Sequence, residues 1–165
     1  MNITLIGMPG AGKSFVGKRL AEKIGYSFFE SDAALEKEYD MPLQKVLDTL
    51  GPDVFLDIEA ARIIENCKEK DRLVISPGGS IVYRDAAMEF LKKTSSIVYL
   101  QVSIEQLEKR IADHPRGIVN SRNMTFAQLF KERTILFEKW ADYAIDGEAE
   151  VGQVVDSIIS GTSVR

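Results

Sequence analysis

The residues of this sequence that are best suited to chemistry lie together at positions 7–14, which read Gly-Met-Pro-Gly-Ala-Gly-Lys-Ser. The stretch fits the pattern G-x-x-x-x-G-K-[ST], in which glycines allow backbone N–H groups to turn inward around phosphate oxygens. Lys13 adds a positive charge, and the hydroxyl of Ser14 can bind Mg²⁺. An apolar run at 3–6 and a helical pattern at 15–24 supply the strand and the helix that must flank such a loop. The stretch therefore predicts a binding loop for the phosphates of a nucleoside triphosphate.

Two further polar turns are expected at the same edge of the fold. The first, Glu30-Ser31-Asp32, follows the short apolar segment 27–29, and the second, Ser76-Pro77-Gly78-Gly79-Ser80, follows the apolar segment 73–75. Ligands of open parallel sheets bind at the carboxyl ends of the strands, so the two turns and the loop should meet around one site.

Glu30 and Asp32 are two residues apart at the end of an extended segment, and we expect them to point the same way. One carboxylate there could orient an acceptor hydroxyl and take its proton, and another could hold a water of Mg²⁺. Ser76 could reach the same metal shell, and Gly78 and Gly79 could allow a substrate close to the backbone. The structural alternatives are that Asp32 only caps the next helix and that the glycines form an ordinary turn.

Two arginines could add positive charge to this site. Arg116 lies in the polar, aperiodic segment 113–124, which we interpret as a lid, and it could close over the phosphates and stabilise the transferring charge. Arg133 lies on the helical pattern 126–140 and could face either the acceptor or only solvent.

The elements that must position these residues alternate between strand and helix along the chain. Short apolar segments predict five strands, near 2–6, 27–29, 73–75, 97–100 and 143–145. This alternation favours a single α/β domain over residues 1–165, with a five-stranded parallel sheet between two helical layers. Residues 32–69 are expected to form a helical insert that binds the acceptor, and Ser31 or Asp32 is expected to cap its first helix.

Composition limits the kinds of protein that this chain can be. Its 165 residues, 45% of them apolar, suffice for one domain with a hydrophobic core. The net charge of −4 argues against a nucleic-acid or acidic-membrane partner. Cys67 is the single cysteine, and neither a signal peptide nor an apolar run of about 18 residues is apparent. We expect a cytoplasmic monomer that acts on a small molecule, with no nucleic-acid or membrane partner.

With these residues assembled, the chain resembles the shikimate kinase family over nearly its whole length. The resemblance begins with the loop 7–14 and the helical segment 16–21 that follows it, and continues at 29–36, where Asp32 matches the second acid of a D-x-D pattern. Residues 51–59 resemble G-E-x-x-F-R-x-x-E, and residues 76–79 resemble S-T-G-G-G. Arg116 matches a lid motif R-P-L-L, and residues 133–142 resemble R-x-x-x-Y-x-x-x-A-D. Arg110, within 107–111, resembles the arginine that packs on adenine in this family.

The resemblance implies a P-loop fold of the nucleoside-monophosphate-kinase type and ATP-dependent, Mg²⁺-dependent phosphorylation of shikimate in aromatic amino acid biosynthesis. It implies that ATP is bound by the loop and by two arginines, namely Gly10, Ala11, Gly12, Lys13, Ser14, Phe15, Arg110 and Arg116. Asp32, Gly78, Gly79 and Arg133 would bind the acceptor. Lys13, Asp32 and Arg116 would be catalytic, with Asp32 as the base. Mg²⁺ would be bound by Ser14 directly and by Glu30 and Ser76 through water.

Several positions on the acceptor side differ from the family pattern. Leu56 stands where the family has an arginine that grips the shikimate carboxylate, Glu30 replaces the first acid of D-x-D, and Ser80 replaces the third glycine of G-G-G. Losing one partner of a buried charged contact costs about 2–5 kcal/mol of binding. The alternatives to shikimate are therefore another small hydroxylated acid or an amino acid such as homoserine. A nucleotide-binding module without catalysis is a further alternative.

Overall fold

The structure, a computed structural model, describes residues 1–162. Within them the chain forms one sheet from five strands, β1 (Asn2–Ile6), β2 (Ser27–Glu30), β3 (Leu73–Ser76), β4 (Ser95–Gln101) and β5 (Tyr143–Asp146). Neighbouring strands all run parallel, in the order β2-β3-β1-β4-β5. The predicted five-stranded parallel sheet is therefore confirmed.

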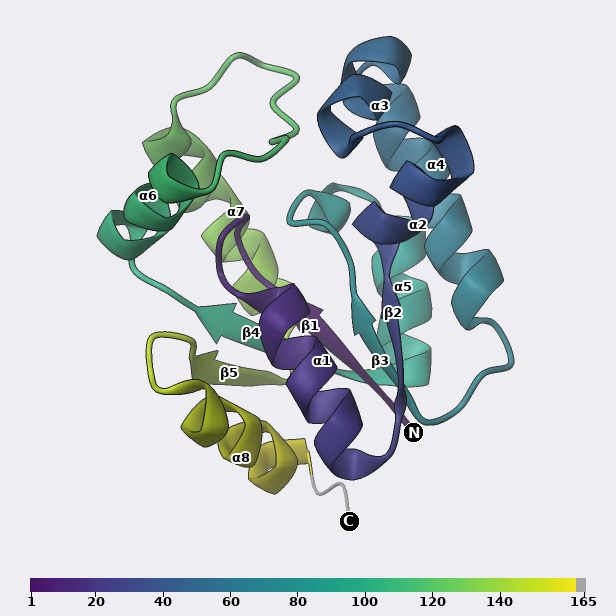
Figure 1. Cartoon of the computed structure of the whole chain (residues 1–165), viewed down its shortest axis with the longest axis vertical. Helices are drawn as coiled ribbons and strands as arrows, with labels where there is room; N and C mark the ends of the chain where they lie inside the picture. Colours follow the sequence, from purple (N-terminus) through teal and green to yellow (C-terminus); the bar gives the residue numbers. More distant parts are fainter. Residues whose placement is uncertain (163–165) are drawn as a thin grey trace.

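Helices cover both faces of this sheet (Figure 1). α1 (Lys13–Ile24) and α8 (Val151–Thr162) pack on one face, and α5 (Asp85–Thr94) and α7 (Phe126–Trp140) pack on the other. β1 is buried along its whole length because it lies between the strands β3 and β4 in the sheet and between the two helical layers. The predicted three-layer α/β/α architecture is thus confirmed as well. Within residues 1–162 no helix combines the length and the apolar composition that a membrane crossing would need.

Three helices follow β2 and project from one end of the sheet, at the upper right of Figure 1. They are α2 (Ser31–Tyr39), α3 (Leu43–Leu50) and α4 (Pro52–Cys67), and they occupy the region where the sequence predicts a helical insert. Their facing sides form an apolar cluster of their own, made of Leu35, Val46, Leu47, Phe55 and Leu56 and joined by Val119. Val119 belongs to the irregular segment between α6 (Ile104–Asp113) and α7, so this segment contacts the insert.

One local prediction is wrong, because neither Ser31 nor Asp32 caps α2. The residue at the N-cap is Glu30, and no side chain caps the helix there. Ser31 is the first residue of the helix, and its hydroxyl donates a hydrogen bond to Glu59 instead (2.6 Å). Asp32 lies in the first turn, where the helix dipole favours its negative charge.

Candidate active site

The phosphate-loop pattern lies where strand β1 passes into helix α1. Gly10 and Gly12 have φ values of 88° and 91°, a left-handed conformation that favours glycine. The side chain of Lys13 turns back into the loop, and its Nζ donates hydrogen bonds to the carbonyls of Gly7 (2.9 Å) and Met8 (3.1 Å). Burial lowers the pKa of Lys13 to about 8, and the nearby Asp32 carboxylate opposes this shift. The loop therefore places a buried cation at the N-terminus of α1, which is a favourable place for phosphate.

A main cavity of about 470 Å³ opens beside this loop and brings together all three predicted turns. Its lining includes most of the residues that the sequence assigns to phosphate, metal and acceptor, namely Gly12, Lys13, Ser14, Phe15, Glu30, Asp32, Ser76, Gly78, Gly79, Arg116 and Arg133. Arg133 is only 1% exposed, so it faces this cavity and not solvent.

The turn 76–80 fits between the loop and the insert only because two of its residues lack a side chain. A Cβ on Gly79 would lie 2.8 Å from Cδ of Pro9 and 3.0 Å from the carbonyl oxygen of Gly7. A Cβ on Gly78 would lie 2.8 Å from Oε1 of Glu59 and 3.3 Å from Oδ1 of Asp32. The glycines thus let the backbone of this turn touch both the phosphate loop and the acidic side chains.

Asp32, which lines the cavity, and Glu59, which lies behind its lining, differ in their surroundings. Glu59 is fully buried, and its Oε1 accepts hydrogen bonds from the Ser31 hydroxyl and the Gly78 N–H (2.8 Å). Within residues 1–162 its Oε2 has no hydrogen-bond partner, and burial raises the pKa of this carboxyl. Burial and the neighbouring Glu59 also raise the pKa of Asp32, to about 7. A carboxyl with such a pKa can exchange a proton near neutral pH.

Glu30 and Asp32 line the same cavity, but not for the reason that the sequence suggests. Glu30 ends strand β2, whereas Asp32 lies on helix α2, so no shared extended segment aligns them. Glu30 accepts a hydrogen bond from the Ser14 hydroxyl and is paired in register with Ser76 on β3. These three residues present oxygen atoms, the ligands that Mg²⁺ prefers, and they suit a metal that keeps most of its waters. In the described part of the chain no three His, Cys, Asp or Glu side chains could hold a metal by themselves.

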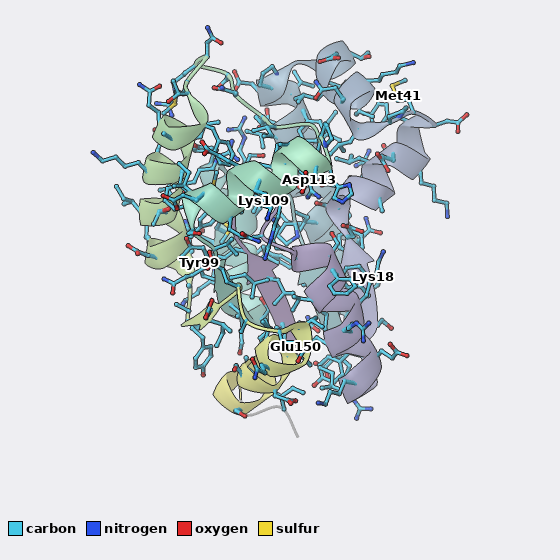
Figure 2. All side chains as sticks on the ribbon, turned by 60° about the vertical axis from the view of Figure 1, so that its left-hand side comes forward. Lys18, Met41, Tyr99, Lys109, Asp113 and Glu150 are labelled. Carbon is cyan, nitrogen blue, oxygen red and sulfur yellow. The ribbon has the colours of Figure 1, made fainter. Side chains whose placement is uncertain are left out.

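A smaller cavity of about 320 Å³ lies on the other side of the loop, between α6 and α8. Figure 2 shows α6, which carries Lys109 and Asp113, above Glu150 at the start of α8. Arg110 lines this cavity, and its Nη1 donates to the carbonyl of Gly10 (3.1 Å). The remaining expected nucleotide residues, Gly10 and Ala11, lie here too. Gly12, Phe15 and Arg116 line both cavities, so a long ligand could extend from one into the other.

Comparison with known proteins assigns this arrangement to a family. A model of the shikimate kinase family matches residues 9–162. The chain belongs to the shikimate kinase family. A shikimate kinase of Thermodesulfovibrio yellowstonii is 37% identical over 150 residues, which cover 89% of this chain and 86% of the relative. Family membership makes this protein a small-molecule kinase with the P-loop fold of shikimate kinases.

Solved structures of the family agree with this assignment. The crystal structure of shikimate kinase from Aquifex aeolicus has a TM-score of 0.85 and 27% identity, and the match covers 99% of this chain and 96% of that one. Shikimate kinase from Acinetobacter baumannii, solved in complex with shikimate, has a TM-score of 0.83 and 26% identity, with 96% and 90% covered.

Leu56, where the resemblance predicts an arginine, does not line the main cavity. It is 3% exposed and packs in the apolar cluster of the insert. It also lines a separate cavity of about 520 Å³, together with Tyr83, Arg122 and Glu132. In this member of the shikimate kinase family, the position therefore contributes to the packing of the insert.

Two residues near the site were not singled out as functional from the sequence. Glu59 is an acid on the buried face of α4, among apolar neighbours, and that placement is the signal that could have identified it. Tyr83 is the last residue of the short 3₁₀ helix η1 (Ile81–Tyr83), and no local sequence pattern indicates that it is functional. Both act on residues that line the main cavity, Glu59 on Asp32 and Tyr83 on Arg133.

Proposed function

We propose that this protein transfers the γ-phosphoryl group of ATP to a hydroxyl of shikimate, which gives shikimate 3-phosphate and ADP in aromatic amino acid biosynthesis. The observation that carries this proposal is that Lys13, Asp32 and Arg133 line one cavity. The reaction needs a cation for phosphate, a base for the hydroxyl and a guanidinium for the carboxylate of the acceptor. The family match and the likeness to a shikimate kinase solved with shikimate support the same acceptor.

On the donor side, the loop amides, Lys13 and Ser14 would bind the phosphates of ATP. Arg110 and the smaller cavity would hold the adenine end, since Gly12, Phe15 and Arg116 connect the two cavities. Mg²⁺, when bound with ATP at Ser14 and through water at Glu30 and Ser76, would neutralise phosphate charge. Arg116 is exposed on the segment 113–124, and we propose that this segment closes over the phosphates as a lid.

On the acceptor side, Asp32 would accept the proton of the hydroxyl that is phosphorylated. Its raised pKa of about 7 suits a general base at neutral pH. Arg133 would bind the carboxylate, because its Nη1 is buried without a hydrogen-bond partner in residues 1–162. Gly78, Gly79 and residues of the insert would form the walls around the ring of the acceptor.

An ADP-release assay with a panel of acceptors tests this proposal. With ATP and Mg²⁺, shikimate should give saturable turnover at submillimolar concentrations, and homoserine and other small hydroxy acids should give little. No turnover with shikimate, alongside normal ATP binding, would overturn the proposal. Turnover with homoserine alone would favour an amino acid kinase, and ATP binding without turnover of any acceptor would favour a non-catalytic module.

A monomeric state and a cytoplasmic location are also part of this proposal, in line with a small acceptor as the only partner. Size-exclusion chromatography with light scattering checks the monomer, for which we expect a mass near 18.4 kDa. A stable dimer would contradict it.

A further inference from the structure

The guanidinium of Arg133 is held from two sides, by Val119, which also lines the main cavity, and by Tyr83, which does not. Its Nη2 donates to the carbonyl of Val119, and its Nε lies 3.4 Å from the hydroxyl oxygen of Tyr83. The guanidinium also lies over the Tyr83 ring, with its carbon 5.3 Å from the ring centroid. Tyr83 therefore contacts the guanidinium through both its ring and its hydroxyl, which leaves Nη1 without a partner among the described residues.

Tyr83 is itself fixed by a second set of contacts. Its hydroxyl donates to Oε2 of Glu132 (2.5 Å), and Glu132 forms an ion pair with Arg122. Because the single hydroxyl proton goes to Glu132, the oxygen lone pairs of Tyr83 remain available to Nε of Arg133. Burial and the bond to Glu132 raise the pKa of Tyr83, so the hydroxyl keeps its proton at neutral pH. The contacts thus run from Arg122 through Glu132 and Tyr83 to Arg133.

The cations of the main cavity are unevenly distributed. Among the described residues that line it, the cations are Lys13, Arg116 and Arg133. Lys13 belongs to the phosphate loop, and Arg116 also lines the smaller cavity, so both face the donor side. Val119, whose carbonyl accepts from Arg133, and Leu56 of the same apolar cluster carry no charge. Binding of an acid at this end therefore depends on one guanidinium, and its orientation decides how well it can bind.

We propose that Tyr83 is a positioning residue that fixes the Arg133 guanidinium, so that Nη1 faces the carboxylate of the acceptor and acids are preferred over neutral alcohols. This inference rests on the proposed function, because it assumes that the acceptor carries a carboxylate. A guanidinium that is already oriented loses less freedom on binding, and this orientation strengthens binding without any contact from Tyr83 to the acceptor.

The test uses Tyr83→Phe in the full-length protein, with Tyr143→Phe as the matched control. Tyr143 is exposed on β5 and lines neither the main cavity nor the cavity beside Tyr83. For each protein one measures kcat and KM for shikimate, KM for ATP, and the melting temperature. One also measures kcat/KM for the neutral alcohol, the analogue of shikimate in which the carboxylate is reduced to a hydroxymethyl group. We expect Tyr83→Phe to raise KM for shikimate about 10-fold, the loss typical of one hydrogen bond to a charged group. The values for the alcohol and for ATP should stay unchanged.

Two further variants grade the effect. Tyr83→Leu removes the ring as well as the hydroxyl and should raise KM for shikimate more than Tyr83→Phe does. Glu132→Gln retains an acceptor for the Tyr83 hydroxyl and should change KM less than Tyr83→Phe does.

The outcomes separate this inference from the proposed function. If wild type is active on shikimate and Tyr83→Phe keeps the same preference for the acid over the alcohol, the inference is wrong and the proposed function stands. Parallel losses with shikimate, the alcohol and ATP would also overturn it, because they indicate a general structural role. A wild-type protein that is inactive on shikimate would overturn the proposed function, and the inference with it.

Discussion

The two ends of the main cavity, at which we propose that the phosphate donor and the acceptor bind, are built in different ways. The donor end is formed by one continuous stretch, 7–14, in which the side chain of Lys13 is held by carbonyls of the same loop. The acceptor end is formed by side chains from distant segments, with Asp32 on α2 and Arg133 on α7. Arg133 is in turn held by Tyr83, 50 residues away in sequence.

This difference predicts which parts of the site tolerate substitution. A loop that binds through backbone N–H groups depends on its glycines and tolerates few changes. An acceptor end made of side chains can gain or lose single contacts while the fold remains the same. In this chain Leu56 packs in the apolar cluster of the insert, while Arg133 and Tyr83 form the charged end.

The largest expected effect is at the donor end, where Lys13→Ala removes the cation from the loop. It should lower kcat/KM about 10⁴-fold. Loss of one group that stabilises the transition state lowers kcat by about 10²–10³, and loss of a charged contact to phosphate weakens the binding of ATP as well. Steady-state ADP release checks this, with Lys109→Ala on the exposed face of α6 as the control. Activity of Lys13→Ala near that of the control would remove Lys13 from the catalytic site.

The next effect concerns Asp32, the carboxylate between the two ends. Asp32→Asn should lower kcat about 10³-fold, within the range of about 10²–10⁴ that a positioned base contributes. Because burial and Glu59 raise the pKa of Asp32 to about 7, kcat/KM of wild type should rise with pH up to about 7 and then level off. Glu59→Gln removes a charge that raises this pKa and should move the midpoint to lower pH. A profile that is flat between pH 5 and 8 would contradict the role of Asp32 as base.

The raised pKa of Asp32 also predicts how stability depends on pH. Its pKa is about 7 in the folded chain and close to 3.8 when the chain is unfolded, so between these values the folded state binds more protons. The contribution of Asp32 to the free energy of unfolding is therefore present at about pH 4 and is lost as pH rises towards 7. Urea unfolding of Asp32→Asn should show a gain in stability over wild type at pH 7.5 that is smaller or absent at pH 4.

The same contrast explains how much the sequence alone could predict. The phosphate loop and the strands could be predicted because each is a local pattern, as in the fully buried run of β1. The burial of Arg133 could not, because it depends on contacts with Val119 and Tyr83, 14 and 50 residues away. The position of Asp32 was predicted through a wrong local geometry, since α2 begins at Ser31 and Asp32 is therefore helical and not extended. The roles of these residues came from the family resemblance and remain predictions.

At the acceptor end, Arg133→Lys tests the guanidinium itself. Lysine keeps the positive charge but cannot form the planar, forked contact with a carboxylate. KM for shikimate should rise about 100-fold, which corresponds to about 2.7 kcal/mol, while KM for ATP should stay within about twofold. The melting temperature is measured in parallel, because Arg133 is buried and also bonds Val119. An equal rise in both KM values would argue against a specific role at the acceptor end.

The smallest expected effect lies where the two ends meet, at Gly79. In Gly79→Ala the new Cβ would lie 2.8 Å from Cδ of Pro9 and 3.0 Å from the Gly7 carbonyl oxygen, so the turn 76–80 and the phosphate loop must move apart. Overpacking of this kind costs about 1–3 kcal/mol of unfolding free energy, which urea denaturation measures. Gly161→Ala is the matched control, because its Cβ would meet only Tyr143 at 3.7 Å, and alanine inside a helix should stabilise the chain by about 0.5–1 kcal/mol relative to glycine. Since the displaced loop binds phosphate, Gly79→Ala should also raise KM for ATP more than KM for shikimate. A larger rise in KM for shikimate than for ATP would mean that the turn 76–80 contributes to the acceptor end and moves without displacing the phosphate loop.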